Sequence, residues 1–256
     1  MKELACLLVV VASFAAASPA WAGPISEYYI VDGDSGQVSV VQGNSIIRTW
    51  TTRLPGEQMP IAVGGTVRIF GEQPGYFGSE YDYNGNWTGT DYPDVGPEGQ
   101  RVDGTTDGVS HNYLAAWNEL GIWQYDRDWA NPVRLFTADG PTGVTYDTTT
   151  GNLWVIEHDR QTVTEFDMAG NRLSSFGFST PSGWMGCLAY EPATDTLWAV
   201  NFYSDDIYQF DKNGNVLESV QIPGLTGYSW GGEFVIPEPA TLSLLSLGLV
   251  ALVRRR

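Results

Sequence analysis

A repeat of 44 residues constrains the fold of this chain more than any other feature. The segment beginning at Tyr146 aligns without gaps with the segment beginning at Tyr190. The matched positions are Tyr146 and Tyr190, Asp147 and Glu191, Leu153-Trp154 and Leu197-Trp198, Phe166-Asp167 and Phe210-Asp211, Gly170-Asn171 and Gly214-Asn215, and Leu173 and Leu217. Such self-similarity predicts two copies of one supersecondary unit, because repeats of this kind stack to bury a shared core.

Each copy alternates short β-rich runs with turn residues. In the first copy one run ends at Tyr146, and three more cover residues 153–157, 162–167 and 172–176. This pattern predicts four strands joined by hairpins. At Asn213-Gly214 we expect a type I′ turn, which requires a positive φ at both residues.

Weaker copies occur upstream, at Tyr81-Asp82 with Gly85-Asn86, and at 122–126, which parallels 207–211. The runs 29–31 and 38–41 predict a further hairpin around Asp32 to Gly36. About five units of four strands and roughly 40 to 45 residues predict an all-β fold, a β-propeller of about five blades. The final run, 229–236, is too short for a blade. We expect it to supply the missing outer strand of the N-terminal blade and so to close the ring.

The two ends of the chain predict export. Residues 1–22 have a charged start at Lys2, an apolar run over 4–17 and an A-x-A cleavage site at Ala20 and Ala22, which predicts a signal peptide for the Sec machinery and a mature N-terminus at Gly23. A membrane anchor is the alternative, but the apolar run is shorter than the ~20 residues of a spanning helix.

The C-terminal segment, residues 237–256, consists of Pro237-Glu238-Pro239, an apolar stretch over 240–253, and Arg254, Arg255 and Arg256. An apolar helix followed by arginines acts as a stop-transfer segment that leaves the preceding chain outside the cytoplasm. The prolines block helix continuation, so the motif is expected to be an extended peptide just outside the bilayer. A plain single-span tail anchor is the alternative interpretation.

This arrangement resembles the PEP-CTERM sorting signal of Gram-negative bacteria, most closely over residues 235–242. The resemblance implies an exosortase as partner, which cuts near Pro-Glu-Pro and releases or re-anchors the body, in bacteria that make extracellular polysaccharide. The repeats resemble NHL-like and lactonase-like propellers. Asp103 to Gly108, followed by blade-like repeats, also resembles an uncharacterised group of PEP-CTERM proteins, and this similarity implies a fold without a known activity.

The predicted body, residues 23–236, is the size of one domain. It carries nine Lys and Arg against 28 Asp and Glu, which argues against nucleic acid or anionic lipid as partners. Cys6 lies in the signal peptide, so Cys187 has no intrachain disulfide partner. Because Cys187 lies in an apolar run, we expect a buried structural thiol.

The carboxylates offer candidate metal ligands. Those at the hairpin turns are better explained as Asx-type turn formers: Asp82, Asp126, Asp167 and Asp211. Asp32 to Gly36 resembles the start of a calcium loop, but Gly43 stands where an EF-hand has its Glu. An acidic connection is either a solvated loop or a weak Ca²⁺ site: Asp91, Asp94, Glu98, Asp103 and Asp107. We expect no metal site and no cofactor, with weak Ca²⁺ binding as the alternative.

Histidine and tryptophan supply the remaining candidates. His111 and His158 are the only histidines, and Glu157-His158-Asp159, at the end of a predicted inner strand, is the best acid/base cluster. We assign no catalytic residue. Trp154 and Trp198 repeat at one strand position and predict blade packing. Four tryptophans near turns are candidate sugar contacts, because aromatic faces stack on carbohydrate: Trp87, Trp129, Trp184 and Trp230.

Together these features predict an exported, exosortase-processed, non-enzymatic propeller at the cell surface or secreted, with a transient inner-membrane anchor. We expect it to bind a component of the extracellular matrix, such as a polysaccharide. Two alternatives remain. One is a calcium-dependent hydrolase or lyase acting at the central channel with Glu157 and His158, and the other is a purely structural scaffold.

Overall fold

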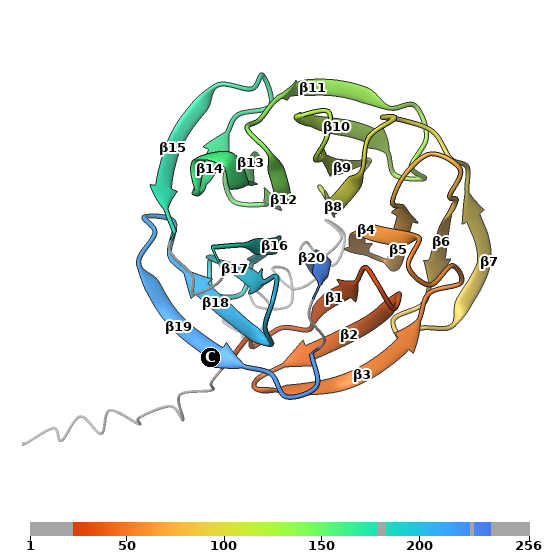
Figure 1. Ribbon diagram of the computed structural model, residues 1–256, viewed down its shortest axis with the longest axis horizontal. Helices are drawn as coiled ribbons and strands as arrows, with labels where there is room; N and C mark the ends of the chain where they lie inside the picture. Colours follow the sequence, from red (N-terminus) through yellow and green to blue (C-terminus); the bar gives the residue numbers. More distant parts are fainter. Residues whose placement is uncertain (1–22, 179–182, 226–227, 237–256) are drawn as a thin grey trace, which may run out of the picture.

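The computed structural model describes residues 23–178, 183–225 and 228–236. Within these ranges twenty strands form five antiparallel sheets of four strands each, arranged as blades around a central axis (Figure 1). The predicted all-β fold and the five four-stranded blades are confirmed. The segments predicted to be the signal peptide (1–22) and the sorting segment (237–256) lie outside the described residues. No helix within the described ranges has the length and apolar character needed to cross a membrane.

Each blade is described from its innermost strand outward. Blade 1 contains β20 (Ser229–Phe234), β1 (Tyr28–Asp32), β2 (Gln37–Gln42) and β3 (Ser45–Thr51). Blade 2 contains β4 (Gln58–Gly64), β5 (Thr66–Gly71), β6 (Gly78–Tyr81) and β7 (Trp87–Tyr92). Blade 3 contains β8 (Arg101–Thr106), β9 (His111–Ala116), β10 (Gly121–Asp126) and β11 (Val133–Thr137). Blade 4 contains β12 (Pro141–Asp147), β13 (Asn152–Glu157), β14 (Thr162–Phe166) and β15 (Arg172–Gly177). Blade 5 contains β16 (Met185–Glu191), β17 (Thr196–Asn201), β18 (Asp206–Phe210) and β19 (Val216–Gln221).

The C-terminal strand β20 closes the ring, but from the inside. It pairs with β1 and lies at the axis, so the prediction that it forms an outer strand was wrong (Figure 1). Its glycines explain this position. A Cβ added to Gly231 would lie 2.0 Å from the backbone oxygen of Met59, and one added to Gly232 would lie 2.5 Å from Sγ of Cys187. Only a strand with glycine at these two positions fits the crowded axis.

Asp103 fills the axis at mid-depth and joins four blades. Its carboxylate accepts hydrogen bonds from the backbone N–H groups of Gly104 and Gly232 at 2.9 Å, of Val144 at 2.9 Å and of Leu188 at 3.0 Å. These donors belong to β8, β20, β12 and β16, which do not pair with one another as strands. Burial raises the pKa of Asp103 well above its usual range, and the four N–H donors oppose that rise. Asp103 was predicted to lie in an acidic loop; it lies instead in an innermost strand.

The repeated residues share one role in blades 4 and 5. The indole N–H of Trp154 donates to Asp147 at 3.4 Å, and that of Trp198 donates to Glu191 at 2.9 Å. Both tryptophans are buried, as expected for blade packing. Cys187 is also fully buried, and its Sγ lies 3.4 Å from the Tyr28 hydroxyl, which confirms the predicted structural thiol.

Three of the four hairpin aspartates form turns, as predicted, whereas the carboxylate of Asp126 accepts from the Asn131 side chain. Asp211 accepts hydrogen bonds from the backbone N–H groups of Asn213 and Asn215 and from the Asn215 side chain, at 2.7–2.9 Å. Asp82 and Asp167 make the same contacts in their blades. The expected type I′ turn was wrong, because of the pair Asn213-Gly214 only Gly214 has a positive φ, of 87°. The Asp211 cap holds Asn213 in an ordinary conformation.

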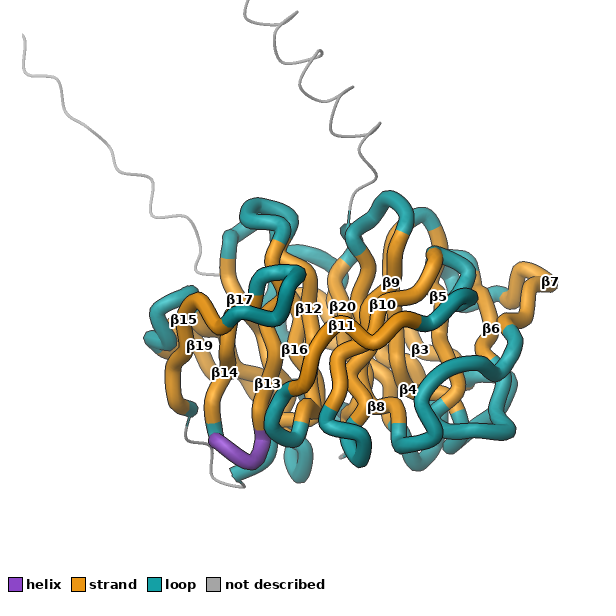
Figure 2. Tube along the Cα trace, turned by 90° about the horizontal axis from the view of Figure 1, so that it is seen from above, coloured by secondary structure: helices purple, strands orange, loops and turns teal. Residues whose placement is uncertain are grey.

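The two ends of β20 distinguish the two faces of the disc. We call the face at its C-terminal end the tail face; Ile236 lies there, and so does Gly23, because β1 runs antiparallel to β20. We call the opposite face the ring face. It contains the N-terminal end of β20 and the short 3₁₀ helix η1 (His158–Arg160), seen at the lower edge of Figure 2. Six residues of strand, roughly 20 Å, separate the two faces.

Candidate functional site

Ten equivalent positions form a ring on the ring face. In every blade, the residue directly after the second strand donates its backbone N–H to a carbonyl oxygen. The acceptor is the residue directly before the innermost strand of the same blade. The distances lie between 2.9 and 3.2 Å, and the donor and acceptor pairs are Gly33 and Tyr228, Glu72 and Glu57, Trp117 and Gln100, His158 and Gly140, and Phe202 and Trp184. The propeller backbone therefore holds ten side-chain positions at fixed places around the axis.

Aromatic side chains occupy the part of the ring that runs from blade 3 through blades 4 and 5 to Tyr228 of blade 1. The rings of His158 and Trp184 have centroids 3.8 Å apart, and Trp117 lies 5.4 Å from both. Phe202 continues the cluster, at 4.4 Å from Trp230 and 5.1 Å from Tyr228. Two of its tyrosines are well exposed, Tyr203 at 56% and Tyr228 at 43%. We call these seven residues the aromatic cluster: Trp117, His158, Trp184, Phe202, Tyr203, Tyr228 and Trp230.

A hollow of about 400 Å³ lies beside the aromatic cluster, at blades 1 and 2. Its lining combines three aromatic rings and a methionine with polar groups: Phe202, Tyr228, Trp230, Met59, Asp34, Glu72, Gln100, Gly33 and Gly56. Gln100 donates from Nε2 to Glu72 at 2.9 Å. Burial raises the pKa of Glu72, an effect that the Gln100 hydrogen bond opposes and the nearby Asp34 and Glu57 reinforce. Apolar rings beside a few oriented polar groups are typical of a small-molecule pocket.

Two features of the cluster indicate backbone strain and a neutral histidine. Tyr228 has a φ of 74°, a left-handed value that is uncommon for a bulky residue, and such strain concentrates at functional sites. Burial lowers the pKa of His158, although Asp159 opposes this effect, which favours the neutral imidazole. Among the described residues, Nδ1 of His158 is buried without a hydrogen-bond partner. The cluster therefore presents uncharged rings with one unused polar atom.

The predicted acid/base cluster is divided by the structure. Glu157 ends β13, the second strand of its blade counted from the axis, as expected for an inner strand. Its buried carboxylate forms an ion pair with Arg172 and accepts hydrogen bonds from Thr164 at 2.7 Å and from the Asp139 backbone at 2.9 Å. His158, the next residue, belongs to the aromatic cluster. The side chains of Glu157 and His158 therefore contact different groups and do not form one acid/base cluster.

The predicted acidic connection does not converge on one point. Asp91 pairs with Arg53, Asp94 with Arg101, and Asp107 accepts hydrogen bonds within its own turn and contacts His111 at 3.2 Å. Within the described ranges, no three His, Cys, Asp or Glu residues are placed to hold a metal ion. Asp32 caps its own loop by accepting hydrogen bonds from Ser35, and the next residues of that loop line the hollow.

The four candidate sugar-binding tryptophans have different places. Trp184 and Trp230 belong to the aromatic cluster, with centroids 6.3 Å apart. Trp129 is fully buried and stacks on Phe70 at 4.9 Å, so it offers no surface contact. Trp87 is 46% exposed on an outer strand, where the guanidinium of Arg53 lies over its ring.

Sequence reasoning missed Phe202, Tyr203, Tyr228 and Trp117. A signal for two of them was present, because Phe202 follows His158 by 44 residues and Trp117 holds the same place relative to its third strand. Tyr228 follows no repeat copy, and only ring closure brings it beside Phe202. The signal residues Ala20 and Ala22, and the sorting residues Pro237, Glu238, Pro239 and Arg254 to Arg256, lie outside the described residues. Gly23 is described, on the tail face.

Comparison with known proteins supports the fold and the sorting segment. The model of the PEP-CTERM protein-sorting motif matches residues 235–256. No curated protein matches the chain. Among solved structures, a chain in a nidogen/laminin complex is similar at a TM-score of 0.56 and 10% identity, covering 83% of this chain and 99% of that one. A protein of unknown function from Bacteroides caccae has a TM-score of 0.50 and 12% identity, covering 80% and 77%.

Virginiamycin B lyase from Staphylococcus aureus, solved with quinupristin as an inactive variant, has a TM-score of 0.49 and 16% identity, covering 79% of this chain and 71% of that one. At these identities the likenesses concern the fold alone. The sorting motif implies export, a membrane-anchored stage and processing by an exosortase. The chain thus carries a PEP-CTERM protein-sorting motif behind the body of a five-bladed β-propeller.

Proposed function

We propose that this protein is displayed at the cell surface or secreted by a Gram-negative bacterium and binds a polysaccharide of the extracellular matrix, without catalysing a reaction. The observation that carries the proposal is the aromatic cluster beside the polar hollow. Aromatic rings stack on the apolar faces of sugars, and Asp34, Glu72 and Gln100 offer acceptors and donors for hydroxyl groups.

The position of the cluster suits a displayed protein. The sorting motif begins on the tail face, directly after Ile236, and the aromatic cluster is on the opposite face. From Ile236 to the first residue of the apolar stretch the chain spans roughly 14 Å at most. While the protein is anchored, the tail face is therefore held near the membrane and the ring face is directed toward the matrix.

Binding to polysaccharide from exopolysaccharide-producing bacteria tests the proposal. We expect saturable binding of the exported protein, measured by calorimetry or by co-sedimentation. Trp230→Ala removes a central ring, and the loss of a stacking contact worth about 1 kcal/mol predicts roughly fivefold weaker binding. Trp87→Ala, which removes an exposed indole from an outer strand, is the matched control and should bind as the parent does. Equal losses in both variants would contradict the assigned site.

The same samples test the absence of catalysis. The bound glycan is recovered after long incubation and compared by mass spectrometry and chromatography with glycan kept alone. We expect no change in chain length or composition. Steady cleavage of the glycan that disappears in Trp230→Ala would replace the binding proposal with an enzymatic one.

A further inference from the structure

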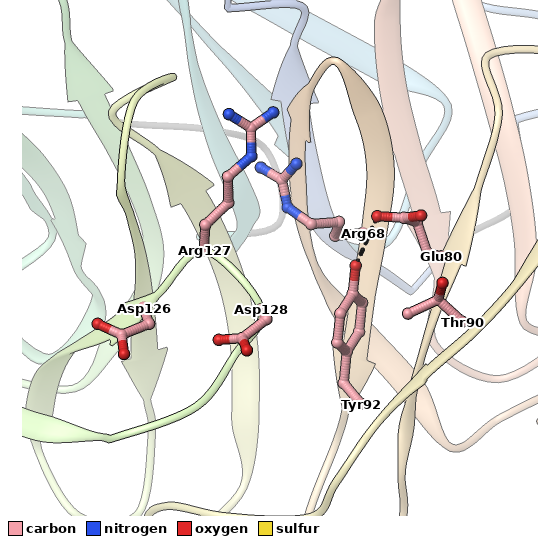
Figure 3. Close-up of a pocket in the computed structure, with 7 residues that line it drawn as sticks. All are labelled: Arg68, Glu80, Thr90, Tyr92, Asp126, Arg127 and Asp128. Carbon is pink, nitrogen blue, oxygen red and sulfur yellow. Dashed lines mark hydrogen bonds between the residues drawn. The ribbon is translucent and has the colours of Figure 1, made fainter.

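A second cavity lies on the tail face between blades 2 and 3. It has a volume of about 480 Å³ and is lined by Arg68, Glu80, Thr90, Tyr92, Asp126, Arg127 and Asp128. Figure 3 shows the guanidinium groups of Arg68 and Arg127 side by side at its upper end. Both donate to the carbonyl oxygen of Gly64, Arg68 from Nη1 at 2.7 Å and Arg127 from Nη2 at 2.8 Å. Two cations thus converge on one backbone oxygen.

Arg68 carries a buried charge without a carboxylate partner. Its side chain is only 2% exposed, and it donates to Gly64, Thr66 and Asn112, which are all neutral acceptors. Its Nε is buried and has no hydrogen-bond partner among the described residues. Burial lowers the pKa of Arg68, and the positive charge of Arg127 lowers it further. A buried, unpaired charge is costly, so an anion at this place would be strongly favoured.

The carboxylates of the cavity are already engaged by other donors. Glu80 accepts hydrogen bonds from Thr66 at 3.0 Å, Thr88 at 2.9 Å and Tyr92 at 2.8 Å, the last drawn as a dashed line in Figure 3. Asp126 accepts from the Asn131 side chain at 2.7 Å, and Asp128 accepts from the Ala130 backbone N–H at 3.3 Å. Within the described chain, no Asp or Glu lies within ion-pair distance of Arg68. The anion that completes the site therefore comes from outside this part of the chain.

The chain leaves the described body at the edge of this cavity. Ile236 is 1% exposed and donates its N–H to the Val63 carbonyl at 3.0 Å. A Cβ added to Gly64 would lie 3.4 Å from the carbonyl oxygen of Ile236, and Gly64 is the residue that both arginines contact. Glu238 follows two positions later, within roughly 7 Å of Ile236 along the backbone before its side chain is counted.

We propose that the Arg68–Arg127 cavity is the docking site for the carboxylate of Glu238, the acidic residue of the chain's own sorting motif. Docking pairs the buried Arg68 and Arg127 with a charge supplied by the tail. Occupation of the cavity by this carboxylate then contributes to the stability of the body.

Disulfide trapping tests the proximity. The exported chain, Gly23 to Arg256 in detergent micelles, carries Thr90→Cys with Pro239→Cys, which leaves Arg68, Arg127 and Glu238 in place. The native thiol does not compete because Cys187 is fully buried. Under mild oxidation we expect a crosslink, detected by mass spectrometry after proteolysis. The matched control is Ala169→Cys with Pro239→Cys, which places the first cysteine at an exposed turn of blade 4 on the same face. Equal or absent crosslinking in the two pairs would overturn the proposal.

A double-substitution cycle tests the charge pairing. Arg127→Gln and Glu238→Gln should each lower the thermal midpoint by about 2–4 °C, and the double variant should lose no more than either single one. Arg134→Gln, on an outer strand, should be additive with Glu238→Gln. Additive losses for Arg127 and Glu238 would refute docking.

Adding free glucuronate or phosphate tests whether an anion from outside the chain, rather than Glu238, occupies the cavity. If docking is correct, these oxyanions raise the midpoint of Glu238→Gln and leave the parent nearly unchanged. Equal stabilisation of both proteins would mean that the cavity binds an external anion and that the tail does not occupy it. These tests concern the tail face alone, so their outcome is independent of polysaccharide binding at the ring face.

Discussion

Replacing Asp103 is expected to destabilise the propeller more than any surface change of the same kind. Asp103→Asn keeps the shape of the side chain but exchanges one carboxylate oxygen for an NH₂ group. In the native protein each oxygen accepts two backbone N–H groups, at 2.9–3.0 Å. The new amide nitrogen would face two donors and leave both unsatisfied in a fully buried place. At about 1–3 kcal/mol for each buried unsatisfied donor, the loss is about 2–6 kcal/mol.

Part of this loss is offset, because the variant no longer buries a charge. We therefore expect a net loss of about 3 kcal/mol in the free energy of unfolding. It would be measured as a lower midpoint of urea unfolding with an unchanged slope. The matched control is Asp205→Asn, whose carboxylate accepts one exposed hydrogen bond from Gln221. It should change stability by less than about 0.5 kcal/mol. If Asp103→Asn lost less than about 1 kcal/mol, the carboxylate would not be joining the blades.

Three further results are expected. Lys212→Met removes the cation that lies 2.7 Å from the buried carboxylate of Asp147. Burial raises the pKa of Asp147, but the contacts with Lys212 and Thr149 outweigh burial and lower the pKa overall. The ion pair therefore stabilises the protein above pH ~4, and this stabilisation is lost on acidification. The variant should thus lose about 3 kcal/mol at pH 7 and progressively less below pH 4 in urea titrations, and a pH-independent loss would contradict the pairing. Gly232→Ala should cost about 1–3 kcal/mol through overpacking against Cys187, checked by thermal unfolding against Gly177→Ala. At Gly177 the nearest atom to an added Cβ lies 3.8 Å away, and neither glycine has a positive φ, so equal losses would place the effect in the backbone rather than the packing. Burial raises the pKa of the Cys187 thiol well above its usual range, so the folded protein should react with a thiol reagent at least a hundredfold more slowly than the unfolded one, and a fast reaction would show that the thiol is accessible.

Much of the architecture could be predicted from the sequence because the contacts that define it are local. The turn of Asp211 to Asn215 is formed by contacts within five residues, and the same residue types at Asp82 and Asp167 form the same turn. The packing pairs Asp147 with Trp154 and Glu191 with Trp198 span seven residues and recur at the repeat spacing. Local contacts of this kind depend little on the rest of the chain, so the strand order within a blade followed from the pattern.

The candidate site was less readable because its residues meet only through ring closure. Trp230 and Met59 line one hollow but belong to opposite ends of the chain. Of the four tryptophans near turns, pattern alone did not separate Trp184 and Trp230, which belong to the aromatic cluster, from Trp129, which is buried. The place of Trp129 is set by its stacking on Phe70 of the neighbouring blade, a contact that no periodicity encodes.

By itself the sequence determined the blade, its four strands and its aspartate-capped turns, together with the sorting motif at the C-terminal end, since each depends on residues close together in the chain. Only the tertiary structure decided that β20 lies innermost, that Asp103 joins four blades, and that ten loop positions form one ring. The physical reason is that these features arise from contacts between residues far apart in the chain, such as Asp103 with Gly232 and Tyr28 with its β20 partner Phe234, where packing at a crowded axis selects the residue and its place.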